Sequence, residues 1–98
     1  MIKNFKVKNL ENNGRQVPNQ FLIEYTENGN DYQIFQSYSS MIIKWENSGI
    51  VEVGKDCNYS KTTSKYRNLL TGMDKKSFEK MLKEDFKWEE GTQSYHRK

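Results

Sequence analysis

Residues 21–35 read FLIEYTENGNDYQIF and hold the pattern that decides the fold. Two apolar-rich segments, Phe21–Thr26 and Asp31–Tyr38, flank Asn28-Gly29. This dipeptide is preferred in a two-residue type I′ turn, because both central residues of that turn need a positive φ. A turn at these two residues makes the numbers of paired residues sum to 57, so the pattern predicts a β-hairpin with a defined register.

The register gives the hairpin two unequal faces. One face is strongly apolar, with Tyr25 opposite Tyr32, Ile23 opposite Ile34, and Phe21 on the same side. The other face is mainly polar, with Glu24 opposite Gln33 and Thr26 opposite Asp31, interrupted by Leu22 opposite Phe35. Antiparallel sheets often pack on one side only, and we expect this hairpin to do so.

The flanking segments predict further strands. Residues 3–10 alternate polar and apolar side chains, which is typical of a half-buried strand. Residues 11–18 read as a polar loop with a turn at Asn12-Asn13-Gly14. Residues 41–45 and 50–53 surround a second turn cluster at residues 46–49 and favour a second hairpin. A short helix starting at Ser40 is the competing interpretation.

From residue 59 the apolar period becomes helical. Ser60 is the expected N-cap of a first helix that ends at Thr71-Gly72, with Thr62, Thr63, Tyr66, Leu69 and Leu70 on one face. Asp74 is the expected cap of a second helix that runs to about Phe86. In this second helix Asp85 falls on the apolar side, where a carboxylate is out of place.

These elements predict a single α+β domain spanning residues 1–98. We expect a small antiparallel sheet of four to five strands in residues 1–58, followed by two C-terminal helices in residues 59–87 and a tail at 88–98. The length of 98 residues suits one domain.

Composition excludes several classes of protein. No apolar run approaches the roughly 20 residues that cross a bilayer, and we expect no secretory signal and no membrane association. A single cysteine, Cys57, rules out a disulfide framework and indicates a reducing compartment. With one histidine, His96, and no paired carboxylates at a catalytic spacing, we expect no catalytic residues, no metal and no cofactor.

The net charge of +3 is unevenly distributed. Residues 1–59 carry 6 basic and 7 acidic side chains, whereas residues 60–98 carry 10 and 6. The basic surplus therefore belongs to the predicted helices and tail, where we look for a partner.

The start of the first helix is one candidate site. Hydroxyl and basic side chains crowd its first turns, whose backbone N–H groups can bind an anion. The candidate contact residues are Ser60, Lys61, Thr63, Lys65 and Arg67. The simpler interpretation is a Ser/Thr cap with solvated lysines behind it.

The second helix carries a stripe of lysines opposite its apolar side. At 100° per residue one face gathers Lys76, Lys80, Lys83 and Lys87. Such a stripe can follow phosphates. Because Glu79 and Glu84 lie close by, an ordinary solvated face is the simpler interpretation.

Tyrosines recur along the chain, at positions 25, 32, 38, 59 and 66. Aromatic side chains on a sheet can stack on nucleic-acid bases, but we favour the interpretation that they fill the core.

Two segments resemble a family of small proteins from bacteriophages and other mobile elements. The family pattern is Ser-Tyr-x-Ser/Thr-x-Ile, then Tyr-Ser-x-Thr-Thr-x-Lys before a helix. The matching residues are Ser37, Tyr38, Ser40, Ile42, Tyr59, Ser60, Thr62, Thr63 and Lys65. The resemblance covers roughly residues 19–72 and implies a bacterial host cytoplasm as the place of action.

Small proteins of such elements often inhibit host defence, as anti-CRISPR proteins do. The resemblance therefore implies a non-enzymatic inhibitor that binds a host defence protein or ribonucleoprotein, such as a Cas effector. A direct nucleic-acid binder in phage replication or regulation is one alternative. A virion accessory protein that self-associates through its hairpin edges is another, and the sequence leaves the oligomeric state open.

Overall fold

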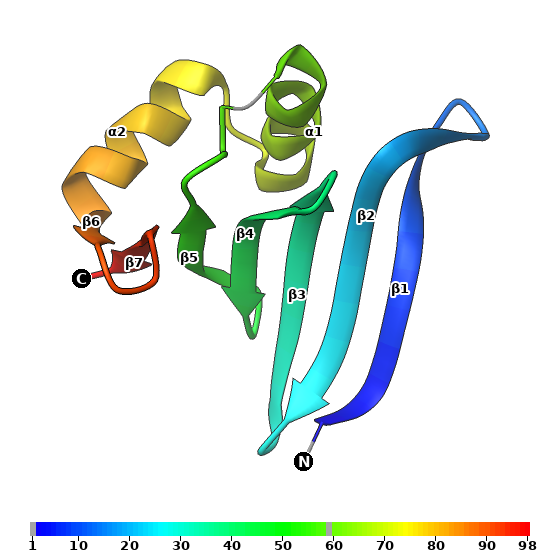
Figure 1. The fold of residues 1–98 in the computed structure, drawn as a ribbon, viewed down its shortest axis with the longest axis horizontal. Helices are drawn as coiled ribbons and strands as arrows, with labels where there is room; N and C mark the ends of the chain where they lie inside the picture. Colours follow the sequence, from blue (N-terminus) through cyan, green and yellow to red (C-terminus); the bar gives the residue numbers. More distant parts are fainter. Residues whose placement is uncertain (1, 59) are drawn as a thin grey trace.

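The computed structural model describes residues 2–58 and 60–98. Over these residues the chain forms seven strands and two helices (Figure 1). In chain order they are β1 (Ile2–Asn12), β2 (Arg15–Glu27), β3 (Asn30–Ser37), β4 (Ser40–Glu46), β5 (Gly49–Gly54), α1 (Lys61–Thr71), α2 (Lys75–Asp85), β6 (Phe86–Glu89) and β7 (Ser94–Arg97). Tyr59, which opens the predicted helical segment and the second motif of the resemblance, lies outside the described residues.

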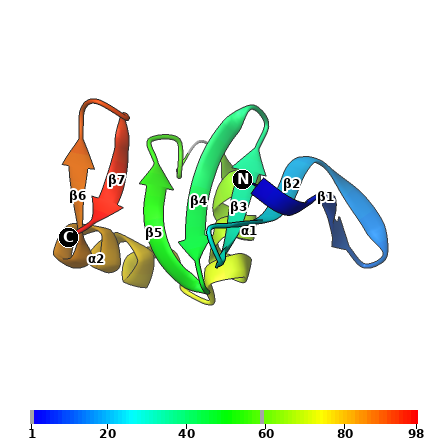
Figure 2. The same ribbon diagram turned by 90° about the horizontal axis from the view of Figure 1, so that it is seen from below.

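The strands form one antiparallel sheet in the order β1-β2-β3-β4-β5-β7-β6. Figure 2 shows β6 and β1 at opposite edges. The α+β class holds, but the predicted architecture of four to five strands followed by two C-terminal helices is wrong. The helices lie between β5 and β6 in the chain, and the predicted tail forms a hairpin whose β7 pairs with β5.

The two missed strands are short, and their neighbour in the sheet is distant in sequence. Each has four residues, too few for an alternating pattern to stand out from a continuing helix. The Val53–Tyr95 pair joins residues far apart in the chain, so no local sequence pattern predicts it. Because α2 ends at Asp85, that carboxylate is exposed at the helix end, which resolves its misplacement on the apolar side.

The hairpin predicted from the Asn28-Gly29 turn is confirmed with its register. β2 and β3 pair from Glu27–Asn30 to Gln20–Ser37 without a shift, the register set by Asn28-Gly29, both at positive φ. The second hairpin forms as β4 and β5 in place of a helix at Ser40. The loop predicted for residues 11–18 is wrong, because Asn13 and Gly14 alone turn the chain.

Both helices pack against the same side of the sheet. Phe35, Ile43 and Val53 are cross-strand neighbours and belong to the buried core together with Tyr66 of α1 and Phe78 of α2. Figure 1 shows the helices near one end of the strands, while the other ends of β1–β3 extend past them. The helices therefore cover only part of one side of the sheet, and no helix covers the opposite side within the described residues.

The caps of both helices are confirmed. Ser60 accepts a hydrogen bond from the backbone N–H of Thr63, and Asp74 accepts one from that of Ser77. Gly72 ends α1 with a φ of 71°. The predicted buried face of α1 needs one correction, because Leu69 is 66% exposed.

Candidate functional site

The first turn of α1 is tied to the sheet. The hydroxyls of Ser37 and Thr63 lie 2.7 Å apart, and Ser60 Oγ lies 3.1 Å from Thr63 Oγ1. Thr63 has no exposed surface. These hydroxyls bond to one another, so Ser60 and Thr63 hold the helix on β3 and Thr63 cannot contact a partner.

Arg67 also proves to be internal. Its side chain is 0% exposed and lies over the ring of Phe78, 4.4 Å from the ring centroid. The guanidinium donates to the carbonyl of Cys57 at 2.9 Å and to the side-chain oxygens of Asn68 and Asn58. Burial lowers the pKa of this guanidinium. Arg67 joins α1, α2 and the segment after β5, so its predicted role as a contact residue is wrong.

Exposed lysines remain on both helices. We use the term helix lysines for Lys61, Lys65, Lys76, Lys80 and Lys83, all of which are exposed. Lys87, the fourth member of the predicted stripe, lies on β6 and not on α2. Phe78 is buried on the opposite side of α2, as the helical period predicted.

The helix lysines have no carboxylate partners within residues 2–58 and 60–98. The ion pairs found there join Lys8 to Glu24, and His96 to Glu52 and Glu89. The pairing of Lys80 and Lys83 with Glu79 and Glu84, expected for a solvated face, is not formed. Lys65 Nζ lies 5.4 Å from the ring centroid of Tyr66. The outer side of the helices therefore presents lysines that form no direct ion pair among the described residues, beside the exposed carboxylates of α2.

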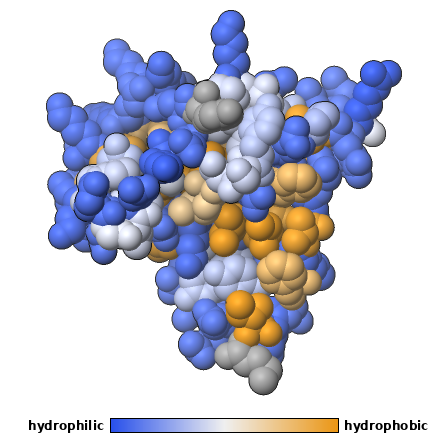
Figure 3. Space-filling model, in the orientation of Figure 1, coloured by the Kyte–Doolittle hydropathy of each residue, from blue (hydrophilic) through white to orange (hydrophobic). Residues whose placement is uncertain are grey.

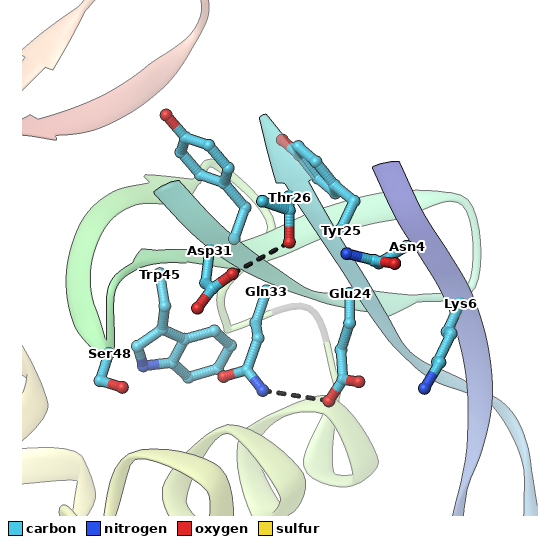
Figure 4. A pocket seen from close by; sticks show the side chains of 10 residues that line it. Asn4, Lys6, Glu24, Tyr25, Thr26, Asp31, Gln33, Trp45 and Ser48 are labelled. Carbon is cyan, nitrogen blue, oxygen red and sulfur yellow. Dashed lines mark hydrogen bonds between the residues drawn. The ribbon is translucent and has the colours of Figure 1, made fainter. Parts of the chain in front are cut away.

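The side of β1–β3 away from the helices is apolar, and the sequence did not single it out as a site. We use the term open face for its side chains, Phe5, Val7, Phe21, Ile23, Tyr25, Tyr32 and Ile34. Val7 pairs with Ile23, which pairs with Ile34. Figure 4 shows Tyr25 pointing away from the helices and Trp45 pointing toward them. Of the tyrosines predicted in the core, Tyr66 is buried there and Tyr25 and Tyr32 are not.

The family model described as "Family of unknown function (DUF8033)" matches residues 3–88, from β1 to β6. The chain belongs to this family. No curated protein and no solved structure matches it. The range shared with DUF8033 includes every helix lysine and the whole open face, so both surfaces belong to the part of the chain that the family model describes.

Outside the DUF8033 range, β7 contributes a polar cluster that the sequence did not reveal. Ser94 Oγ donates to Glu52 at 2.7 Å, and His96 Nε2 lies 3.0 Å from Ser94 Oγ and 2.7 Å from Thr92 Oγ1. A nucleophile–base–acid relay needs both ring nitrogens of histidine, whereas these contacts all meet Nε2. The cluster is therefore not arranged as such a relay.

The thiol of Cys57 in this DUF8033 protein is buried. Burial raises the pKa of the Cys57 thiol, which disfavours the thiolate. Within the described residues no group of His, Cys, Asp and Glu side chains could hold a metal ion. Each of the two described helices has 11 residues, too few to span a bilayer.

A groove of about 320 Å³ lies on the helix side of β1–β3, beyond the helices (Figure 4). It is lined by Trp45, Gln33, Glu24 and Lys6, among others. Its polar groups bond to one another, since Gln33 donates to Glu24 at 3.1 Å and Thr26 donates to Asp31 at 2.9 Å. None of the predicted contact residues lines it.

Proposed function

We propose that the chain is a non-enzymatic binding module that inhibits a host nucleic-acid-directed defence complex. The contact surface is the outer side of α1 and α2, and the partner surface is acidic protein or RNA of that complex. The helix lysines carry the proposal, because they are exposed and lack carboxylate partners among the described residues. The setting in a mobile element comes from the sequence resemblance.

The charge distribution supports this choice of surface. The lysines project from one side of α2 while Phe78 anchors the other side in the core, so the helix backbone holds them at fixed spacing. Each lysine that neutralises a phosphate adds a salt-dependent increment of affinity, with a slope of about −0.7 per contact on a single strand. An acidic protein surface attracts the same lysines with a weaker dependence on salt.

A reconstituted cleavage assay tests the proposal. We expect excess wild-type protein to block cleavage by an RNA-guided effector, and the variant Lys76→Glu/Lys80→Glu/Lys83→Glu to lose the block. The matched control replaces Lys3, Lys6 and Lys98, three exposed lysines outside the helices, and changes the net charge equally. Full cleavage with excess wild-type protein across several effector types contradicts the proposal, and so does equal loss of inhibition in the control.

Direct nucleic-acid binding is the second candidate, because the same lysines could follow a phosphate backbone. It predicts a gel shift of free RNA or DNA that weakens steeply between about 50 and 200 mM salt. A shift of free nucleic acid without inhibition of any effector favours this candidate. Inhibition without such a shift favours the protein surface of the complex.

A further inference from the structure

The open face exposes the apolar surface that a sheet normally buries. Phe5 and Val7 are 60% and 55% exposed. Ile23 and Ile34 continue the row across β2 and β3. Figure 3 shows an apolar patch over the middle of these strands, surrounded by polar surface. Contiguous apolar patches of this kind mark interaction sites.

The total surface of the chain is larger than that expected for a compact monomer of its mass. A compact monomer of 11.7 kDa is expected to expose about 5,900 Å². The chain exposes 6518 Å², about a tenth more, and is only 22 Å thick against 35 Å in the other two directions. The excess is comparable to the roughly 800 Å² per partner that a standard protein interface buries.

The aromatic rings of the open face are poorly placed for nucleic acid. Tyr25 and Tyr32 stack on each other, with ring centroids 5.1 Å apart and ring planes 20° apart. Lys44 Nζ lies 5.0 Å from the centroid of Tyr32. Because protein groups already lie against these rings, a base cannot stack on Tyr32 as it does on an exposed aromatic platform.

The charges beside the patch suit a second copy of the same surface. In the sheet register, Lys44 is the cross-strand neighbour of Ile34, and Glu46 is that of Tyr32. Glu52 of β5 is the next cross-strand neighbour of Lys44. This margin carries both signs of charge. A two-fold interface brings identical patches together, so a margin of one sign would repel its copy, whereas a mixed margin allows lysines of one copy to face carboxylates of the other.

We infer that two copies of this chain pair through their open faces, sheet against sheet, to form a two-fold dimer. The Val7–Ile23–Ile34 row of each copy packs on that of the other, at the separation of about 10 Å usual for stacked sheets. The helix lysines lie on the far side of each sheet and remain exposed in the dimer. The inference does not depend on the proposed function, because the two surfaces are separate.

Sedimentation equilibrium of the full chain, from low to high micromolar concentration, tests the dimer. We expect the mass to approach twice 11.7 kDa. Val7→Glu should weaken the dimer by about 100-fold or more, because a two-fold interface would bury two new carboxylates, one from each copy. Ile34→Glu should do the same, and its distance from the sheet edge separates face pairing from pairing through the edge of β1.

The matched control is Leu69→Glu, which places the same charge at an exposed apolar residue of α1 and should leave the dimer intact. Circular dichroism confirms that each variant is folded; if Ile34→Glu fails to fold, the exposed Val7→Glu decides alone. A wild-type mass of 11.7 kDa throughout the series overturns the inference. A dimer that survives Val7→Glu, or one that survives Ile34→Glu in folded form, or one that is lost in Leu69→Glu, also overturns it.

Discussion

The two sides of the sheet differ in a way opposite to the usual rule. The helix-covered side includes fully buried polar side chains, Gln20 and Ser37, and Ser37 contacts Thr63 of α1. The open face carries valine, isoleucine and aromatic side chains with no helix over them. The apolar pattern of the β1–β3 hairpins therefore does not decide which side of the sheet the helices cover. The most apolar surface lies over the centre of the sheet, where Phe35, Ile43 and Val53 meet, and the helices pack there.

Truncating neighbouring apolar side chains on the two sides should give the largest contrast in stability. Phe35→Ala removes a fully buried ring and should lower the free energy of unfolding by about 3–5 kcal/mol. Ile34→Ala, its neighbour on the open face, should lower it by only about 1 kcal/mol in dilute solution. Denaturant titration measures both. Equal losses in dilute solution would mean that the open face is also covered within the monomer.

A second pair of substitutions concerns the polar side chains. Gln20 is fully buried, and its side-chain amide has no hydrogen-bond partner among the described residues. Gln20→Met keeps the length of the side chain and removes the unsatisfied amide, so it should raise the free energy of unfolding by about 1–2 kcal/mol. Gln36→Met is the control and should lower the free energy of unfolding, because Gln36 lies on the other side and the substitution removes its hydrogen bond to the carbonyl of Tyr38.

Thermal unfolding of these two glutamine variants provides the measurement. If Gln20→Met lowers the melting temperature as Gln36→Met does, the buried amide is satisfied in solution, and the contrast between the two sides is weaker than the structure indicates.

The smallest expected effect lies at the start of α2. The backbone N–H and side chain of Ser77 hold the pKa of the Asp74 carboxyl below its usual range. A folded pKa below the unfolded pKa stabilises the fold fully above the unfolded value, and this stabilisation is lost as pH falls through the folded value. Asp74→Asn should therefore reduce the fall in melting temperature between about pH 5 and pH 2.

Glu84→Gln, at an exposed carboxyl near the other end of the same helix, is the control for Asp74→Asn. Identical acid profiles of the wild type and Asp74→Asn would show that the cap does not titrate with folding. The Asp74 cap bears on the stability of the covered side of the sheet, because it begins the helix whose Phe78 packs in the core.

Predictions from the sequence succeeded where the cause was local. The β2–β3 register follows from two turn residues, and the caps at Ser60 and Asp74 act within three positions of their partners. The lysine stripe of α2 follows from the helical period as far as Lys83. It failed at Lys87 because the helix ends at Asp85.

The candidate site was predictable only in part for a similar reason. Lys61 and Lys65 are exposed as expected, but Arg67 is enclosed by Phe78 of α2 and the carbonyl of Cys57. A charged side chain is normally expected at the surface, and only the position of α2 reveals that this one is buried. The open face was visible in the sequence as the apolar side of the β2–β3 hairpin, but the packing expected for this side is wrong, because the helices cover the side that carries Leu22 and Phe35.

The amino-acid sequence alone determined the Asn28-Gly29 turn, the β2–β3 register and the helix caps, because each depends on residues a few positions apart. The tertiary structure alone decided which side of the sheet the helices cover and where β6 and β7 join it. Alternation along a strand creates two faces but cannot say which one receives the helices. That choice depends on cross-strand contacts between distant residues, above all the row of Phe35, Ile43 and Val53, and it left Val7, Ile23 and Ile34 without a helix over them.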